Sequence, residues 1–343
     1  MKRIVSILAV LAMLMVFAAA CADDPPAPPE APDEAPAEAP VEAPAEAPAE
    51  ASADGERELT FVIGVSEMSA HPFFMNITAG MRSVLEPAGF EVITRAGDYD
   101  VTTQLTDMED FIAQGVDGII ASPASASAAK AVFEQAQAAG IPIVIVDNPS
   151  PDLDLIVANV ATENYMAGVQ AARQVIEDIG TEGEVAVLHM VEWESCVKRY
   201  EGFRDTLAAE APGIEIVAVL DYAGMEDAAM SNTEDLMTAN PGVAAIFAVN
   251  EAGAFGAFAA LVAMNRTDVL IYSVDGSTDF INAILAGDGA GTAAQATWEM
   301  GVKAAEIMLD VLLRGVYPTE QNIWIDPLWL TADTPEIHTF VGF

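Results

Sequence analysis

The sequence predicts an α/β protein made of two doubly wound lobes, each a parallel sheet with helices on both faces. The first observation behind this prediction is that short, continuously apolar segments alternate with segments of helical spacing. Strands buried on both faces appear as apolar runs, whereas amphipathic helices carry apolar residues every three or four positions. The second observation is the number of predicted strands. It is too large for one doubly wound sheet, and two lobes accommodate these strands.

The first half of the globular part alternates strands and helices with little interruption. The expected strands are residues 60–65, 90–94, 118–121 and 142–146. The expected helices are residues 73–85, 108–113 and 126–139.

The same pattern starts again at the apolar segment 155–158. The expected strands are residues 184–189, 215–220, 244–249 and 269–274, with terminal strands within 322–330. The expected helices are residues 166–179, 200–209, 230–237, 255–264, 280–285 and 300–313. The repetition of the alternating pattern is what favours two lobes over one.

The first 20 residues are expected to be a signal peptide. Lys2 and Arg3 precede a short apolar run, and three alanines follow before Cys21. A positive start, a short apolar segment and small residues are typical of an export signal, and the run is short for a membrane span. This segment resembles the lipobox of bacterial lipoproteins, which implies lipidation of Cys21. Ala18 departs from the usual leucine, and secretion without a lipid is the alternative.

Residues 21–57 are expected to be a disordered tether. They consist mostly of Pro, Ala, Glu and Asp, with a repeated Glu-Ala-Pro unit. Such a segment cannot bury an apolar face, and its like charges repel one another. In an extended conformation it could reach on the order of 100 Å.

The chain is strongly acidic, with a formal net charge of −40 and only 13 Lys and Arg residues. Nucleic acids and anionic lipid surfaces need basic patches, so neither is an expected partner. A salty habitat would explain the charge, and a cationic ligand is a second explanation. Because lipidation would occupy Cys21, Cys196 has no partner for an intramolecular disulfide.

Polar and aromatic side chains follow several predicted strands. Ligands of open α/β sheets bind beyond the carboxyl ends of the strands, and those ends can face one cleft between two lobes. Carboxylates and amides bind hydroxyl groups, and aromatic rings stack on the C–H faces of a sugar. The candidate binding residues are His71, Phe73, Phe74, Asp147, Asn148, Trp193, Tyr222, Asn250, Asp275 and Gln295. Helix capping, turn formation and core packing are the alternative roles of these residues.

Six segments in a characteristic order resemble the ribose-binding-protein-like family. They are HPFF at 71–74, VDGII at 116–120 with Pro123, GIPIV at 140–144, RYEGF at 199–203, AVNE at 248–251 and VDG at 274–276. The likeness runs from about residue 59 to the C-terminal strands. The family comprises bacterial substrate-binding proteins of carbohydrate ABC importers, with the fold called periplasmic binding protein type I.

The resemblance implies two lobes that are joined by three crossovers and close on a sugar like a hinge. It places residues 58–160 and 296–325 in one lobe, and residues 161–295 and 326–343 in the other.

The resemblance also implies roles for single residues. Phe73 and Phe74 match ring-stacking aromatics, and His71 stands in place of an asparagine. Asp147 matches the aspartate that grips hydroxyls in the first lobe. The second-lobe and hinge contacts are matched by Asn250, Asp275 and Gln295.

Two departures from the ribose-binding pattern bear on the ligand. Asn148 and Val197 stand where ribose binders carry arginines, and Arg199 matches a structural arginine. Losing two guanidinium groups removes planar, multi-donor contacts to hydroxyls, so the ligand is not expected to bind as ribose does. Stacking by Trp193, Tyr222 or Trp298 and hydroxyl acceptance by Glu192 or Glu194 are expected instead.

No enzymatic machinery, metal site or cofactor site is expected. Cys196 has no accompanying base, and His71, His189 and His338 lack the spacing of a metal site. The glycine-rich segment 287–291 lies between a helix and a strand, which favours a turn over a phosphate loop.

The expected function is that of a monomeric, lipid-anchored protein that captures a sugar or polyol and delivers it to an ABC permease. Two alternatives stay open. One is a ligand sensor for chemotaxis or two-component signalling. The other is a receptor for a non-sugar molecule, such as a furanose-like autoinducer or a nucleoside.

Overall fold

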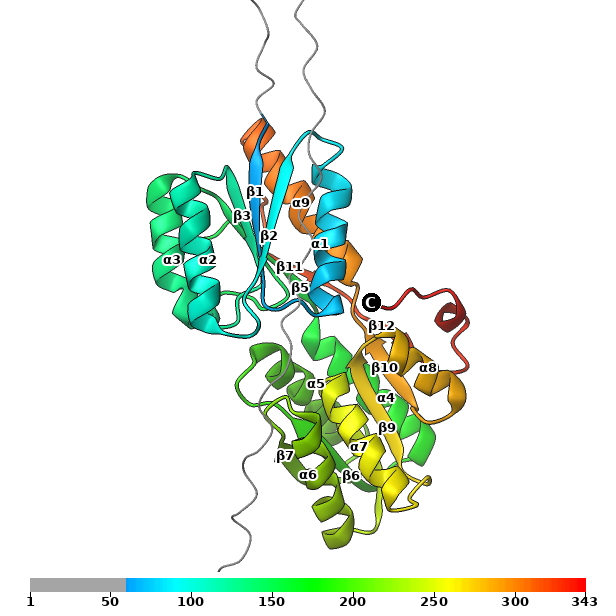
Figure 1. Cartoon of the computed structure of the whole chain (residues 1–343). Helices are drawn as coiled ribbons and strands as arrows, with labels where there is room; N and C mark the ends of the chain where they lie inside the picture. The colour runs from blue at the N-terminus through cyan, green and yellow to red at the C-terminus, as the bar shows by residue number, and fades with distance from the viewer. Residues whose placement is uncertain (1–59) are drawn as a thin grey trace, which may run out of the picture. The chain divides into compact units, whose positions relative to one another are not determined.

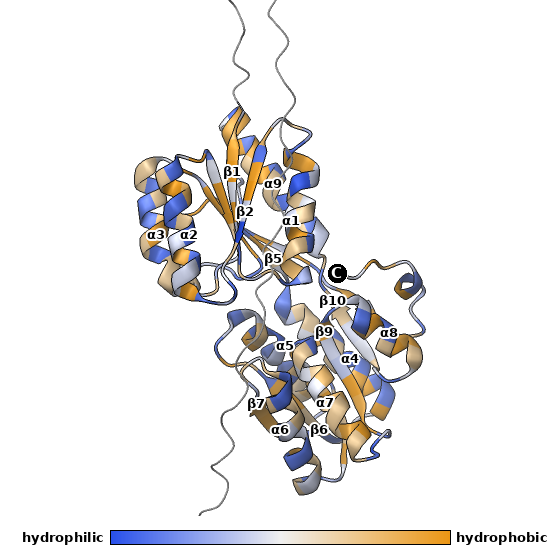
Figure 2. Ribbon diagram, viewed as in Figure 1, coloured by the Kyte–Doolittle hydropathy of each residue, from blue (hydrophilic) through white to orange (hydrophobic). Residues whose placement is uncertain are grey.

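Two six-stranded sheets organise the part of the chain that the computed structural model describes, residues 60–343 (Figure 1). Each sheet is covered by helices, which confirms the predicted fold class of two α/β lobes. The expected signal peptide, Cys21 and the expected tether lie outside the described residues. Figure 2 shows apolar residues concentrated along the strands and hydrophilic residues on the outward faces of the helices.

The first lobe contains a fully parallel sheet with the strand order β11-β5-β4-β3-β1-β2. Its strands are β1 (Val62–Glu67), β2 (Glu91–Ala96), β3 (Gly118–Ala121), β4 (Ile143–Val146), β5 (Ala158–Thr162) and β11 (Asn322–Ile325). Its helices are α1 (Pro72–Leu85), α2 (Val101–Gln114), α3 (Ala126–Ala139) and α9 (Thr297–Arg314). Helices α1 and α9 pack on one face of the sheet, and α2 and α3 pack on the other (Figure 1).

The second lobe contains a sheet with the strand order β12-β10-β9-β8-β6-β7. Its strands are β6 (Glu182–His189), β7 (Gly213–Asp221), β8 (Val243–Ala248), β9 (Leu270–Asp275), β10 (Gly291–Ala294) and β12 (Leu328–Leu330). Its helices are α4 (Asn164–Ile179), α5 (Glu194–Glu210), α6 (Glu226–Ala239), α7 (Glu251–Ala263) and α8 (Thr278–Ala286), followed by the 3₁₀ helix η1 (Pro335–His338). The edge strand β12 is antiparallel to β10. The prediction of a fully parallel sheet is therefore wrong for this one strand.

Three crossovers connect the lobes, as the fold class requires. Glu163 separates β5 from α4, residues 295–296 separate β10 from α9, and residues 326–327 separate β11 from β12. The predicted terminal strands 322–330 are therefore divided between the two sheets. Because β5 runs to Thr162, the first crossover lies just beyond the lobe boundary expected at residue 160.

Several helices begin earlier than predicted, because their first turns are polar and lack apolar spacing. Helix α2 begins at Val101 rather than at residue 108, with Asp100 accepting a hydrogen bond from the Thr103 amide at 2.7 Å. Helices α5 and α6 likewise begin several residues before the predicted positions. Within residues 60–343, no helix combines the length and the apolar character needed to cross a membrane.

Close packing of α4 against α5 fixes the position of Arg199. A Cβ atom on Gly168 would lie 1.9 Å from the carbonyl oxygen of Arg199, and a Cβ on Gly202 would lie 2.0 Å from that of Tyr165. The two backbones can approach this closely only because both positions are glycine. The approach holds Arg199 beneath the carboxyl edge of the second sheet.

Candidate functional site

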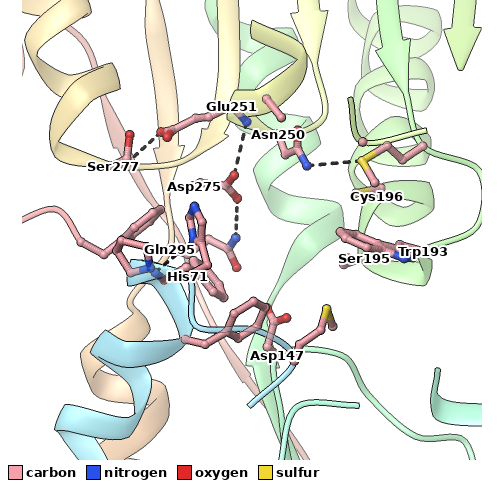
Figure 3. A pocket seen from close by; sticks show the side chains of 18 of the residues that line it. His71, Asp147, Trp193, Ser195, Cys196, Asn250, Glu251, Asp275, Ser277 and Gln295 are labelled. Carbon is pink, nitrogen blue, oxygen red and sulfur yellow. Dashed lines mark hydrogen bonds between the residues drawn. The ribbon is translucent and has the colours of Figure 1, made fainter. Parts of the chain in front are cut away.

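A cavity of about 830 Å³ is lined by residues of both lobes. Its polar side chains come from segments that follow the carboxyl ends of strands, where ligands of α/β sheets bind. The structure brings eight of the ten predicted site residues to this cavity: His71, Phe73, Phe74, Asp147, Trp193, Asn250, Asp275 and Gln295. Figure 3 shows how these side chains converge from different elements.

Asp275 is the most extensively hydrogen-bonded carboxylate of the cavity. Its Oδ1 accepts from Nε2 of Gln295 at 2.7 Å and from Nη1 of Arg199 at 3.3 Å. Its Oδ2 accepts from the backbone amide of Glu251 at 3.3 Å (Figure 3). Burial raises the pKa of Asp275, and the nearby guanidinium opposes that rise. These donors fix the orientation of a carboxylate that faces the cavity.

Arg199, which was expected to match a structural arginine, also lines the cavity. Its side chain is 4% exposed and lines the cavity. Its Nε donates to Oδ1 of Asn164 at 2.8 Å, and its Nη1 donates to the carbonyl oxygen of Val249 at 2.8 Å. These bonds and the one to Asp275 use Nε and Nη1, so Arg199 organises the second-lobe wall through three of its five N–H donors.

Asn250 combines two roles that the sequence offered as alternatives. It caps α7, because its Oδ1 accepts from the amide of Gly253 at 3.3 Å. It also lines the cavity, where its Nδ2 donates to the sulfur of Met190 at 3.3 Å. The cap fixes the side chain at the edge of the cavity.

Glu251 of the AVNE segment is not among the ten expected binding residues, yet it lines the cavity. Its Oε1 accepts from the amides of Gly276 at 2.8 Å and Ser277 at 2.9 Å. Burial is the main cause that raises the pKa of Glu251, and the carboxylate of Asp275 adds to it. Glu251 therefore holds the turn after β9 and with it the position of Asp275.

Tyr222 and Asn148 are not brought into the cavity. The ring of Tyr222 is fully buried beneath α7, its hydroxyl donates to Oδ1 of Asn250, and burial raises its pKa. Nδ2 of Asn148 donates to the carbonyl oxygen of Pro123 at 2.7 Å. Both residues support neighbours of the cavity instead of lining it. Trp298, Glu192 and Glu194 also lie outside the lining.

The first-lobe wall is formed mainly by Asp147 and aromatic rings. Asp147 has a φ of 64°, in the left-handed region, and its burial raises the pKa of the carboxyl to about 6. Non-glycine residues adopt this backbone region at a cost, and such residues gather at functional sites. His71 caps α1, with its Nδ1 accepting from the amide of Phe73 at 3.2 Å, and it lines the cavity as well.

A stacked aromatic pair connects the lobes at the cavity. The rings of Tyr99 and Trp193 are 6.3 Å apart at 15° between planes, and both residues line the cavity. Trp193 packs against core residues of both lobes. Apolar faces and hydrogen-bonding groups together suit a ligand with C–H faces and hydroxyls.

Within the described residues, no group of three or more His, Cys, Asp and Glu side chains is arranged to hold a metal ion. Cys196 lines the cavity, but burial raises the pKa of its thiol to about 11, so the sulfur stays protonated at neutral pH. A protonated thiol is a poor nucleophile. The arrangement is suited to binding.

Comparisons with known proteins find binding proteins among the relatives of this chain. The chain is 28% identical over 258 residues to the ribose import binding protein RbsB of Bacillus subtilis, covering 75% of this chain and 83% of the relative. It is 27% identical over 277 residues to the xylitol-binding protein of Mycolicibacterium smegmatis, covering 80% of this chain and 78% of the relative. These relatives are binding proteins, and the prediction that the chain is not an enzyme is confirmed.

A solved structure shows the same fold. A sugar-binding protein of a sugar ABC transporter from Bacillus halodurans superimposes with a TM-score of 0.75 at 26% identity, covering 82% of this chain and 99% of that chain. The family model described as periplasmic binding protein domain matches residues 63–315. That match spans both lobes and well over half of the chain, so the chain belongs to the periplasmic binding protein domain family.

Proposed function

We propose that this protein captures a sugar or polyol outside the cytoplasmic membrane and delivers it to an ABC permease. The observation that carries the proposal is the interlobe cavity, in which Asp147, Asn250 and Asp275 meet aromatic rings from both lobes. The names of the relatives support a carbohydrate ligand, because they bind ribose, D-apiose and xylitol.

The ligand contacts follow from the chemistry of the lining. Carboxylates and the Asn250 amide bind hydroxyl groups, and Phe73, Phe74 and Trp193 cover C–H faces. Because three short crossovers join the lobes, a ligand that contacts both lobes can favour a closed arrangement.

A thermal-shift screen of pentoses, hexoses, polyols and nucleosides tests the ligand class, followed by calorimetry on each compound that binds. A ligand that binds only the native state raises the melting temperature, by an amount that grows with its concentration over Kd. We expect D-ribose, D-apiose or xylitol, or a close relative of these, to raise it. If no carbohydrate does so, the proposed ligand class is wrong.

The role in import is tested in cells. We expect deletion of the gene to abolish uptake of the radiolabelled sugar or polyol that binds best, and the intact gene to restore it. Unchanged uptake together with lost chemotaxis or lost transcriptional response to that compound would favour a sensor instead.

We further propose that the protein acts as a monomer held to the membrane by a lipid on Cys21, with residues 21–57 as the tether. The Cys21→Ser variant should move from the detergent phase to the aqueous phase in detergent partitioning and appear in the culture medium. Cys196→Ser is the matched control and should stay in the detergent phase. Equal partitioning of both variants would contradict the lipid anchor.

A further inference from the structure

Residues 339–343 form a strap that follows η1 and is held by the second lobe. The backbone amide of Thr278 donates to the carbonyl oxygen of Phe343 at 3.3 Å. A Cβ atom on Gly342 would lie 2.6 Å from the amide nitrogen of Thr278 and 2.8 Å from the carbonyl oxygen of Gly276. Phe340 packs against the second-lobe core. Only glycine at position 342 lets the strap approach the start of α8 this closely.

The Phe343 side chain reaches the opposite lobe. Its ring centroid lies 5.2 Å from that of Phe73, with the ring planes at 88°, and 6.0 Å from that of His71. Phe343 packs against the first-lobe core and lines the cavity. Figure 1 shows the C mark beside the start of α1, consistent with these contacts. One residue thus has its backbone on the second lobe and its ring on the first.

The Phe343 ring adds an aromatic contact to a cavity in which two arginine contacts are missing. Trp193, Tyr222 and Trp298 were the aromatic residues expected to replace the contacts of two missing arginines, and of these three only Trp193 lines the cavity. Phe343 and Phe73 meet edge to face, as Phe73 and Phe74 do at 5.1 Å and 80°. The three rings form a continuous aromatic cluster, and Phe73, Phe74 and Phe343 all line the cavity that Asp275 also lines.

We propose that Phe343 is a ligand-contacting residue whose ring, next to Phe73, covers a C–H face of the bound sugar or polyol and links the lobes across the cavity. This inference rests on the proposed function for its ligand. The link between the lobes rests on the contacts of the strap alone, because both rings of the Phe73–Phe343 pair belong to the protein.

The binding experiment compares Phe343→Ala, Phe343→Leu and Phe343→Tyr by calorimetry with D-ribose, D-apiose and xylitol. We expect Phe343→Ala to weaken binding about five- to tenfold, as loss of an aromatic contact does. Phe343→Leu should also weaken it, and Phe343→Tyr should retain it. If Phe343 only filled apolar space, Phe343→Leu would bind the ligand as tightly as the wild type. Val341→Ala is the matched control, because Val341 lies on the strap and is 85% exposed.

A ligand-free arm separates this inference from the proposed function. In the absence of any carbohydrate, Phe343→Ala should speed amide hydrogen exchange at Thr278 and in the first turn of α1, whereas Val341→Ala should not. Unchanged exchange overturns the link between the lobes. Wild-type affinity of Phe343→Ala overturns the ligand contact alone. If the wild type binds none of the carbohydrates, the proposed function and the ligand contact both fail.

Discussion

Gln295 donates its side-chain amide to the carboxylate of Asp275 at 2.7 Å (Figure 3). Its carbonyl oxygen, Oε1, accepts from the hydroxyl of Thr162 at 2.7 Å. Thr162 ends the last strand before the first crossover, Gln295 begins the second crossover, and Asp275 faces the cavity. One side chain therefore connects the hinge to the binding site.

Asp275→Asn tests the central carboxylate with little change of volume. We expect binding of any carbohydrate that binds the wild type to weaken about 10- to 100-fold, since hydrogen bonds to a charged group contribute about 1.5–3 kcal/mol. Calorimetry measures the loss, and circular dichroism checks the fold. Asp310→Asn, on the outer surface of α9, is the control. Wild-type affinity of Asp275→Asn would remove Asp275 from the site. Asp275→Ala is less informative, because it leaves the buried Arg199 without this acceptor.

The hinge contact is tested by a double-mutant cycle of Gln295→Leu and Thr162→Val. Gln295→Leu removes the acceptor of the buried Thr162 hydroxyl and one of the three donors to Asp275, so the free energy of unfolding should fall by about 1–3 kcal/mol. Thr162→Val should cost less, and the double variant should cost less than the sum of the two. Urea denaturation measures all three. Strict additivity would show that the two side chains do not interact in solution.

Asp147 should make stability depend on pH between about 4 and 7. Burial raises its pKa to about 6 from an ordinary value of 3.8, so the folded protein binds this proton more tightly than the unfolded chain. The stability that this carboxyl contributes is therefore greatest at pH values below its pKa in the unfolded chain, and it falls as the pH rises through its folded-state pKa of about 6. The melting temperature of Asp147→Asn, which does not titrate, should rise relative to wild type over this range. A difference that stays constant with pH would refute the assignment.

The charge of the cavity should select against anions. Five carboxyl groups and one guanidinium line it: Asp147, Glu226, Glu251, Asp275, Asp279 and Arg199. The charge of the guanidinium is partly offset by its contact with Asp275, and the carboxyl groups of the lining outnumber it. We expect D-ribonate and D-xylonate to bind at least about tenfold more weakly than D-ribose and xylitol, because like charges repel across a site. Tighter binding of the acids in calorimetry would contradict this.

Sequence patterns were reliable where the physics is local. Apolar runs and helical spacing depend on neighbours in the chain, and they predicted the α/β alternation and the strand ends at which Asn250, Asp275 and Gln295 lie. The starts of α2, α5 and α6 were missed, since a polar first turn depends on capping more than on apolar spacing.

These patterns could not predict which of the strand-end residues face the cavity. Tyr222 and Asn250 both follow strands of the second sheet, yet Tyr222 lies beneath α7 while Asn250 lines the cavity. Arg199 faces the cavity because glycines let α4 and α5 touch. No spacing in the sequence relates Phe343 to Phe73, which are separated by nearly the whole globular part.

The sequence by itself determined two α/β lobes, a charge that disfavours nucleic acid, an expected export signal with Cys21, and a short set of strand-end residues. Only the tertiary structure decided that Arg199, Glu251 and Phe343 line the cavity and that Tyr222 and Asn148 do not. The reason is that hydrophobic periodicity specifies which face of an element is buried. Packing between residues far apart in the chain determines which surfaces of the two lobes face each other and where the strap runs.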